Sequence, residues 1–442
     1  MKIACFTTLL PVRSGISDYN GDLLPFLSKY VDIDIFIDDY EPAKELRQRF
    51  NIYSYKEFER RYASGEYDLV LYHMGNNPYH FYLYPFLIKY PGITVLHDYV
   101  LHHFYSGMTW IKGDVEGYLE ELRYNHGKMG EELGKVIVKG MITGLELFVF
   151  PMNKRIIDSS LGVIVHSDYI KGEIENYHPG ANVKKIHMGI PAIDSRSFNR
   201  REAKEKLGIP SDSFVLGVFG FVTPMKRVAL VLNAFNKVLK VIPDAILLIV
   251  GNIEDDGIDE MIKELNLEKN VRITGYVPGE DFKAYIMATD IAVNLRYPTA
   301  GETSASLLRI MGMGVPVIIF NYRQFAEIPD DSCVKIDLGE NEVDDLYRAI
   351  KKVDSSNYLL RKIGEKGREY VLKNCNLEES AREYYDFILN VFNKNRVNNY
   401  RGKMTARFKS NMSKDLAEMG VTKNTSSFMY DVTKGLKEMD IE

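Results

Sequence analysis

The stretch RYPTAGETSASLLRIMGMGVP, residues 296–316, decides the fold and directs the search for a site. Its first part is a loop rich in Pro, Gly, Thr and Glu, and its second part predicts a short apolar helix over Ala305–Met313. Thr303 and Ser304 stand where a helix N-cap belongs, so the first backbone N–H groups of this helix are free to bind an oxyanion. Such a helix start suits a diphosphate. The alternative is an ordinary strand, loop and helix without a ligand.

The residues before this loop, ATDIAVNLRY at 288–297, predict a strand whose carboxyl end delivers the loop. Ligands of open α/β sheets bind at such carboxyl ends. Strands and helices alternate in both halves of the chain, and crossover helices join parallel strands. We therefore expect an α/β protein of two Rossmann-like domains, whose parallel sheets face each other across a cleft.

Composition limits the class of protein. The chain has 442 residues, of which 45% are hydrophobic and 26% charged, as in a globular protein of two domains. A net charge of −5 gives no reason to expect a nucleic-acid partner. Cys5, Cys333 and Cys375 are far apart in sequence, which favours a reducing, cytoplasmic compartment. No signal peptide is expected, and no apolar run approaches the ~20 residues of a membrane-spanning helix.

Changes in composition along the chain indicate its division into parts. We expect an N-terminal Rossmann-like domain over residues 1–190 and a C-terminal one over 214–375. The polar, charged stretch 191–213 predicts the connection between them. An amphipathic helix is expected over 376–393, followed by a basic amphipathic extension over 394–442.

The first half carries two pairs of candidate site residues. Ser14 and Gly15 lie in the loop after the first strand, before an amphipathic helix that is expected to begin near Asp18, and a glycine there lets the backbone approach a ligand closely. His97 and Asp98 follow a strand predicted over Ile93–Leu96, and such a pair can bind sugar hydroxyls or exchange protons near neutral pH. We expect His102 to be the partner of His97. Metal binding by the three histidines of this stretch is an alternative.

The second half begins with a pair of cations. Lys226 and Arg227 are predicted at the first turn of the first helix of the C-terminal domain. Cations at a helix N-terminus oppose the helix dipole, so they are expected there if an anion lies between them and the helix. A nucleotide diphosphate is the natural candidate. The alternative is two solvated basic side chains.

A set of short motifs is similar to those of a known family. In chain order they are Ser14 with Gly15, the pair His97 and Asp98, the turn Gly220, Pro224 and Lys226, the strand end Val250 and Gly251, the run Gly275, Tyr276 and Val277, the loop with Glu302, and the helix exit Met311, Gly314, Pro316, Val317 and Ile318. With these motifs the chain resembles the GT-B retaining glycosyltransferases of family 4, from residue 1 to about residue 393. The similarity is strongest in the second half.

This resemblance implies transfer of a sugar from a UDP- or GDP-sugar to a glycan, lipid-linked or protein acceptor. It implies retention of the anomeric configuration, with no metal and no cofactor besides the nucleotide-sugar co-substrate. The catalytic residues are then Glu302, Lys226 and His97. The helix 376–393 is expected to return to the first domain.

The resemblance also assigns donor contacts. Lys226, Arg227 and the N–H groups of Thr303 and Ser304 after Glu302 are expected to stabilise the charge of the leaving diphosphate. Gly15 allows the N-terminal loop to close over the phosphates, and Gly220 opens the turn that carries Lys226. His97, next to Asp98, holds a hydroxyl of the donor sugar. Tyr276 and Val277 are expected beside the base.

The chain departs from the family pattern at two places. The family has two glutamates about eight positions apart. In this chain Arg309 stands at the second of these positions and Gly301 at the first. Glu302 can serve as the first glutamate only if the loop is shifted by one residue. An arginine cannot accept hydrogen bonds from ribose hydroxyls. Phe221 replaces a phosphate-binding arginine, for which Arg227 or Arg296 is expected to compensate. A catalytically inactive GT-B module that binds a glycan or a partner protein is therefore the alternative function.

The C-terminal extension has a composition of its own. Residues 394–414 contain basic side chains and no acid, with apolar residues at roughly helical spacing. Such a segment can lie on an anionic membrane, at the inner face in a cytoplasmic protein, or against an acidic partner. Docking on the protein itself is the alternative. A further apolar pattern over 428–439 suggests an oligomer contact.

Overall fold

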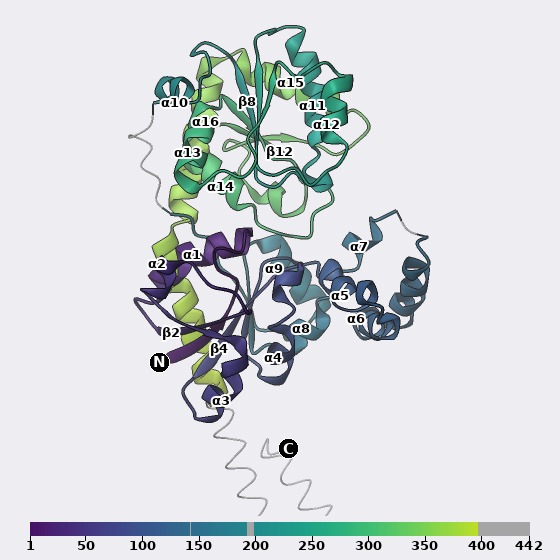
Figure 1. Cartoon of the computed structure of the whole chain (residues 1–442), viewed down its shortest axis with the longest axis vertical. Coiled ribbons are helices and arrows are strands. Elements are labelled where there is room, and N and C mark those ends of the chain that lie inside the picture. Colours follow the sequence, from purple (N-terminus) through teal and green to yellow (C-terminus); the bar gives the residue numbers. More distant parts are fainter. Residues whose placement is uncertain (142, 192–198, 397–442) are drawn as a thin grey trace, which may run out of the picture. The chain divides into compact units, whose positions relative to one another are not determined.

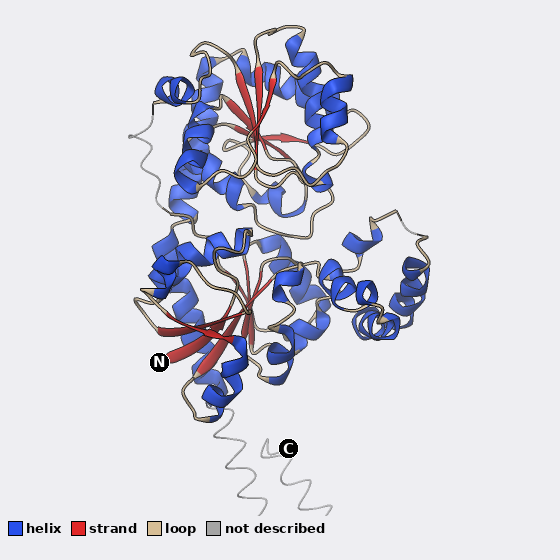
Figure 2. Cartoon of the chain, viewed as in Figure 1, coloured by secondary structure: helices blue, strands red, loops and turns tan. Residues whose placement is uncertain are grey.

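A computed structural model describes residues 1–141, 143–191 and 199–396 of the chain (Figure 1). Two separate β-sheets, each with helices around it, make up this part of the protein (Figure 2). All strand pairs in both sheets are parallel, so the predicted α/β class with two parallel sheets is confirmed. The C-terminal extension, for which we expected a membrane or oligomer contact, lies outside the described residues from position 397 on.

The first sheet has seven strands in the order β3-β2-β1-β4-β5-β6-β7. Their bounds are β1 Lys2–Phe6, β2 Asp32–Ile37, β3 Asn51–Ser54, β4 Leu69–Met74, β5 Ile93–Leu96, β6 Gly162–Val165 and β7 Val183–Lys185. The helices of this half are α1 Gly15–Leu27, α2 Lys44–Arg47, α3 Phe58–Ala63, α4 Tyr84–Lys89, α5 His102–Met108, α6 Val115–Val138, α7 Glu146–Val149, α8 Lys154–Asp158 and α9 Asp168–Tyr177. The central strands are buried along their length, as expected for strands covered on both faces.

The second sheet has six strands in the order β10-β9-β8-β11-β12-β13. Their bounds are β8 Val215–Phe219, β9 Ile246–Val250, β10 Val271–Ile273, β11 Ile291–Val293, β12 Val317–Phe320 and β13 Val334–Ile336. The helices are α10 Arg200–Lys206, α11 Val228–Leu239, α12 Ile258–Glu264, α13 Gly279–Ala288, α14 Ala305–Gly312, α15 Glu342–Asp354 and α16 Asn357–Asn374, and a further helix covers 377–396. Helix α10, which falls in the stretch 191–213, is held to the second half by the ion pair of Lys204 with Asp290 at 2.8 Å.

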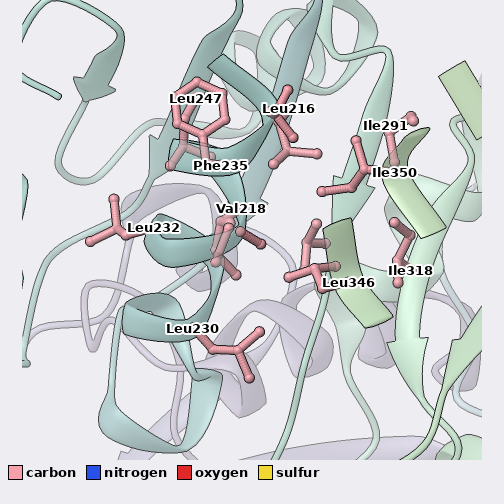
Figure 3. Packing of buried hydrophobic residues seen from close by; sticks show 14 of the residues in the cluster. Leu216, Val218, Leu230, Leu232, Phe235, Leu247, Ile291, Ile318, Leu346 and Ile350 are labelled. Carbon is pink, nitrogen blue, oxygen red and sulfur yellow. The ribbon is translucent and has the colours of Figure 1, made fainter. Parts of the chain in front are cut away.

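The core of the second half shows why its strands and helices form where they do. One buried cluster contains Leu216 and Val218 of β8, Phe235 of α11, and Leu346 and Ile350 of α15 (Figure 3). All five side chains are buried. Because α11 and α15 each present one apolar stripe, they can pack only with that stripe on the sheet.

The strand order places the candidate site. In the first sheet β1 lies between β2 and β4, and in the second β8 lies between β9 and β11, so each sheet has a point where successive connections leave in opposite directions. In sheets of this kind ligands bind in the crevice beyond the carboxyl ends of the strands at this point. In the second sheet, the loops after β8 and β11 meet there.

The last described helix returns to the first half. Lys29, just after α1, pairs with Glu378 at 2.9 Å, and the hydroxyls of Tyr19 and Tyr384 are 3.2 Å apart. Within the described residues no helix is both long and apolar enough to cross a membrane. The three cysteines are buried and free.

Candidate functional site

Three charged side chains meet beyond the carboxyl ends of β8 and β11. Lys226 ends the short 3₁₀ helix η5, Pro224–Lys226, which follows β8, while Arg296 and Glu302 lie in the loop after β11. The two loops are joined because the Tyr297 N–H donates to the Met225 carbonyl at 2.9 Å. Arg296 Nε lies 3.4 Å from Glu302 Oε1. We call Lys226, Arg296 and Glu302 the charged cluster.

Lys226 is a buried cation with little support from the protein. Burial and the neighbouring charge of Arg296 hold the pKa of Lys226 well below its ordinary value, whereas Glu302 raises that pKa. The ammonium donates to the Phe219 carbonyl at 2.6 Å, its one hydrogen bond within the described residues. An ammonium has three donors, so this cation has capacity to bind an anion. Gly220 has a φ of +86°, and a Cβ there would lie 2.6 Å from Lys226 Nζ.

The loop that carries Glu302 is held in a defined shape. Glu302 Oε2 accepts from the Thr299 hydroxyl at 2.7 Å and from the Ala300 N–H at 3.0 Å. The Ala300 carbonyl in turn accepts from the Val100 N–H at 2.8 Å. Gly301 has a φ of +88°, and a Cβ there would lie 2.7 Å from the Cβ of Tyr99. Only glycine fits at this position, so Gly301 shapes the loop.

Helix α14 begins where the sequence predicts. Ser304 is its N-cap, and the Ser304 hydroxyl accepts from the Leu307 N–H at 3.3 Å. Thr303 directly precedes the cap. A nitrogen of the Arg296 guanidinium lies 3.5 Å from the Ser304 hydroxyl, so the positive end of the helix dipole lies beside the charged cluster.

His97 belongs to a group of buried histidines. His97 Nε2 and His73 Nδ1 are 3.0 Å apart and share a hydrogen bond. Burial holds the pKa of His97 well below its ordinary value, so the ring is neutral near pH 7. Our prediction that His102 is the partner of His97 was wrong: His102 bonds instead to the Tyr118 hydroxyl at 2.6 Å. Among the described residues, no three His, Cys, Asp or Glu side chains are arranged to hold a metal.

Asp98 connects the first half to the charged cluster. Its carboxylate accepts from the Asn76 N–H at 2.7 Å. Burial, followed by the charge of Glu302, raises the pKa of Asp98 to about 7. An influence of Glu302 on this pKa requires the two carboxyl groups to be close, so the structure brings the predicted pair His97 and Asp98 to the same region as Glu302.

The loop after β1 differs from the prediction in one respect. Helix α1 begins at Gly15, not near Asp18, because the Ser14 hydroxyl caps it by accepting from the Ser17 N–H at 3.1 Å. Gly15 is therefore the first helical residue and not a loop residue. A Cβ at Gly15 would meet no protein atom within 4 Å. The fold does not require glycine at this position, so the empty space there is available to a ligand.

Arg227, which the sequence predicts in the same site as Lys226, is not part of the charged cluster. Helix α11 begins at Val228, so Lys226 and Arg227 precede it and do not lie in its first turn as we expected. Arg227 has a φ of +56°, and its guanidinium pairs with Glu342 of α15.

Tyr276 and Val277 follow β10, the strand at one edge of the second sheet. The Tyr276 ring is exposed, and the guanidinium carbon of Arg13 lies 4.4 Å from its centroid. Val277 is partly buried.

Sequence analysis missed two residues that touch the predicted site. Gln324, in the 3₁₀ helix η6 Arg323–Glu327, donates to the Thr299 hydroxyl at 2.8 Å and to the Glu302 carbonyl at 3.0 Å. Arg13 stacks on Tyr276, as described above. Gln324 carries no motif and is distant in sequence from the predicted residues that it contacts. Arg13 directly precedes the predicted pair Ser14 and Gly15, but its contact with Tyr276 joins segments far apart along the chain.

The second half of the chain matches a known family. Residues 199–370 match the family model described as Glycosyl transferases group 1. The uncharacterised glycosyltransferase MJ1069 of Methanocaldococcus jannaschii is 27% identical over 227 residues, which are 50% of this chain and 56% of that protein. The putative glycosyltransferase YtcC of Bacillus subtilis is 21% identical over 243 residues, which are 50% of this chain and 58% of YtcC. The matches thus span little more than half the length of these relatives.

Solved structures share the fold. Sucrose-phosphate synthase from Thermosynechococcus elongatus superposes with a TM-score of 0.65 at 17% identity, over 89% of this chain and 100% of that one. HepE of Anabaena, solved in complex with UDP, gives a TM-score of 0.63 at 14% identity over 88% and 99% of the two chains. WaaG, a glycosyltransferase involved in lipopolysaccharide biosynthesis, gives a TM-score of 0.60 at 14% identity, over 88% of this chain and 99% of the WaaG chain. The two parallel sheets are thus those of the GT-B fold.

Proposed function

Because residues 199–370 match the family model described as Glycosyl transferases group 1, we propose that the chain transfers a sugar from a nucleotide-diphosphate sugar to a hydroxyl of a glycan, lipid-linked or protein acceptor. The observation that carries this proposal is the charged cluster, in which a buried Lys226 and a largely buried Arg296, whose side chain is 12% exposed, lie beside Glu302. Two largely desolvated cations beside one carboxylate leave a net positive charge, which suits an anionic ligand.

The proposed chemistry follows from the negative charge that develops on the leaving diphosphate. The bond between the anomeric carbon and the diphosphate oxygen breaks, and the electron pair leaves with the diphosphate. A bond forms between the same carbon and the acceptor oxygen, whose proton passes to a phosphate oxygen, giving the nucleoside diphosphate and the glycoside. Lys226, Arg296 and the start of α14 stabilise the leaving charge in the role that a divalent ion plays in other enzymes.

The remaining residues position the sugar. Glu302, fixed by Thr299 and Ala300, accepts hydrogen bonds from donor hydroxyls. His97, held neutral by burial, binds another hydroxyl from the first half. The acceptor attacks on the face from which the diphosphate departs, so the anomeric configuration is retained and no separate protein base is assigned. Arg227 takes no part in this scheme, because Glu342 pairs with it.

The donor class is the next part of the proposal. HepE, which shares the fold, was solved with UDP and with UDP-glucose. UDP is therefore the first probe for this chain, and GDP is the second.

The test combines nucleotide binding with turnover. Thermal unfolding of the full chain is measured with UDP, GDP and their common sugar conjugates, and release of the nucleoside diphosphate is followed by mass spectrometry. We expect Lys226→Ala and Glu302→Ala each to lower turnover on the order of 100-fold, since loss of one preorganised contact costs ~3 kcal/mol. Lys237→Ala, which removes the partner of Asp344, is the control.

Three results would contradict the proposal. Turnover near that of the wild type in both variants removes the assigned site. Nucleotide binding without any turnover favours an inactive module, and interconversion of sugar nucleotides without transfer favours an epimerase.

A further inference from the structure

His73 is hydrogen-bonded to His97, the predicted sugar contact of the first half, but the proposed mechanism gives His73 no role. His73 belongs to β4, where it lies opposite Val95 of β5. The His97 N–H donates to the Met74 carbonyl at 2.9 Å. The imidazole rings of His73 and His97 have an interplanar angle of 23° and centroids 5.3 Å apart. His97 is therefore held to β4 both by its backbone and by its side chain.

The ring nitrogens of this pair differ in their surroundings. His73 Nδ1 and His97 Nε2 are 3.0 Å apart and share one hydrogen bond. His73 is fully buried, and His97 is 5% exposed. Among the described residues, His73 Nε2 is a buried atom without a hydrogen-bond partner, and His97 Nδ1 does not belong to this group of atoms. Within the pair, His97 Nδ1 is thus the nitrogen that remains for a ligand.

Burial keeps both rings neutral. It lowers the pKa of His73 to about 3, and the neighbouring His166 and His80 add to this effect. Burial also holds the pKa of His97 well below its ordinary value. A neutral imidazole has one donor nitrogen and one acceptor nitrogen. The proton in the shared hydrogen bond comes either from His73 Nδ1 or from His97 Nε2, so the tautomers of the two rings are coupled.

The burial of His73 Nε2 decides between these two arrangements. If His97 Nε2 carried the shared proton, His73 Nε2 would be a buried N–H without an acceptor among the described residues. Along protein backbones, buried N–H groups without an acceptor are rarer than under-satisfied carbonyls. The same preference assigns the shared proton to His73 Nδ1. His97 Nε2 is then the acceptor, and His97 carries its own proton on Nδ1.

We propose that His73 is a positioning residue, which fixes His97 in the tautomer with a proton on Nδ1 so that His97 donates a hydrogen bond to a hydroxyl oxygen of the donor sugar. This inference rests on the proposed glycosyl transfer. The rings of Tyr19 and His166, with centroids 5.6 Å and 5.4 Å from that of His97, pack against the same imidazole. In the proposed scheme Glu302 accepts hydrogen bonds from the sugar, so His97 supplies the complementary donor.

The first test compares two substitutions of nearly equal size. The amide nitrogen in His73→Asn is as many bonds from the backbone as Nδ1 of histidine and can donate to His97 Nε2, whereas His73→Leu has no donor. Both full-length variants are assayed for UDP release from UDP-glucose and for GDP release from GDP-mannose. We expect kcat/KM of His73→Leu to be lower than that of His73→Asn by on the order of tenfold, the effect of one lost hydrogen bond.

A merely structural role for His73 predicts the opposite order. Leucine is more easily buried than asparagine, because burial of a polar group without partners is costly. Thermal unfolding of both variants measures this effect separately. In the background of His97→Phe, the two substitutions at His73 should no longer differ in turnover, because the acceptor of the hydrogen bond is missing.

His102 provides the matched control. It is a buried histidine of the same half, but its Nε2 is hydrogen-bonded to the Tyr118 hydroxyl and not to His97. His102→Asn and His102→Leu are therefore expected to have the same kcat/KM, whatever their stabilities. Only variants that unfold cooperatively are compared.

The second test observes the tautomer directly and needs no substrate. The nine histidines of the chain are labelled with ¹⁵N, and the His97 signals are identified by their loss in His97→Phe. Protonated and unprotonated ring nitrogens have distinct ¹⁵N chemical shifts. We expect a protonated Nδ1 and an unprotonated Nε2 for His97 in the wild type and in His73→Asn, and a mixture of both tautomers in His73→Leu.

The outcomes separate this inference from the proposed function. A proton on His97 Nε2 in the wild type overturns the inference, and so does equal turnover in His73→Asn and His73→Leu. Absence of turnover by the wild type with every sugar nucleotide contradicts the proposed function, whereas the ¹⁵N spectrum still decides whether His73 fixes the tautomer of His97.

Discussion

The guanidinium of Arg309 lies 3.0 Å from the carboxylate of Asp22 and joins α14 to α1. Burial raises the pKa of Asp22, and the charge of Arg309 opposes this effect. The family pattern has a glutamate where Arg309 stands, so this chain has an ion pair between its two halves at that place. The pair accounts for Arg309 without a ligand.

We expect this ion pair to contribute little to stability. The two side chains are 28% and 30% exposed, and partly exposed pairs contribute about 0.2–1 kcal/mol. The coupling between Arg309→Ala and Asp22→Ala in a double-mutant cycle of urea unfolding should fall in that range. Arg309→Glu should destabilise more than Arg309→Ala, since it places like charges together. Strictly additive single effects would show that the pair does not form.

Gly15 gives a prediction in which stability and activity change in opposite directions. Alanine is a better helix former than glycine by about 0.5–1 kcal/mol, and neither Gly15 nor Gly21 of α1 has a protein atom near the added Cβ. Gly15→Ala and Gly21→Ala should therefore both keep or raise the melting temperature. We expect only Gly15→Ala to lower turnover, by tenfold or more, because its methyl group occupies the ligand's space. Equal turnover in both variants would remove Gly15 from the site.

Asp98 makes stability depend on pH. Its pKa is about 7 in the folded protein and 3.8 ordinarily, so between these values the folded state holds a proton that the unfolded state releases. Stability contributed by Asp98 is therefore present below pH 4 and lost as the pH rises toward 7. The side chain of the variant Asp98→Asn cannot ionise. The melting temperature of this variant minus that of the wild type should therefore increase as the pH rises across this interval, and should stay constant above pH 7.

The control for this titration is Asp256→Asn, which changes an exposed carboxylate. Melting temperatures of the three proteins are compared from pH 4 to pH 8. A difference between Asp98→Asn and the wild type that does not vary with pH would show that Asp98 is ionised throughout the interval.

Substitution of Gly301 tests how closely the loop that carries Glu302 packs against Tyr99. Gly301 and Gly65 both have a positive φ, of +88° and +79°, but a Cβ at Gly65 would meet open space. Gly65→Ala should cost about 1–2 kcal/mol from backbone strain alone. Gly301→Ala should cost a further 1–3 kcal/mol or so, because its methyl group meets Tyr99. The free energy of unfolding is measured in urea. Equal losses would show that the loop does not pack closely against Tyr99.

Much of the fold can be predicted from local patterns. The strand Ile93–Leu96 and the cap of α14 at Ser304 lie where the sequence predicts, because short apolar runs and capping residues act on their nearest neighbours in the chain. The helix starts at α1 and α11 were misplaced. In α1 the Ser14 hydroxyl accepts from the Ser17 N–H, so the helix begins earlier in the chain than the amphipathic pattern predicts.

The candidate site could be predicted only in part. Lys226 and Glu302 were expected together, and the charge of Glu302 does act on Lys226. The partner of His97 could not be predicted, because His73 comes from a neighbouring strand and His102, nearer in sequence, turns to Tyr118. Arg227 was assigned to the diphosphate, but nothing along the chain indicates that Glu342 pairs with it.

The amino-acid sequence by itself determined the alternation of strands and helices, the parallel sheets and the motifs at the strand ends, since each depends on residues close along the chain. The tertiary structure alone decided which of those strand ends meet. Strand order brings β8 beside β11 and β4 beside β5, and with them Lys226 to Arg296 and His73 to His97. Buried charges and orphaned polar atoms also exist only in the folded chain, because burial is a property of packing and not of sequence.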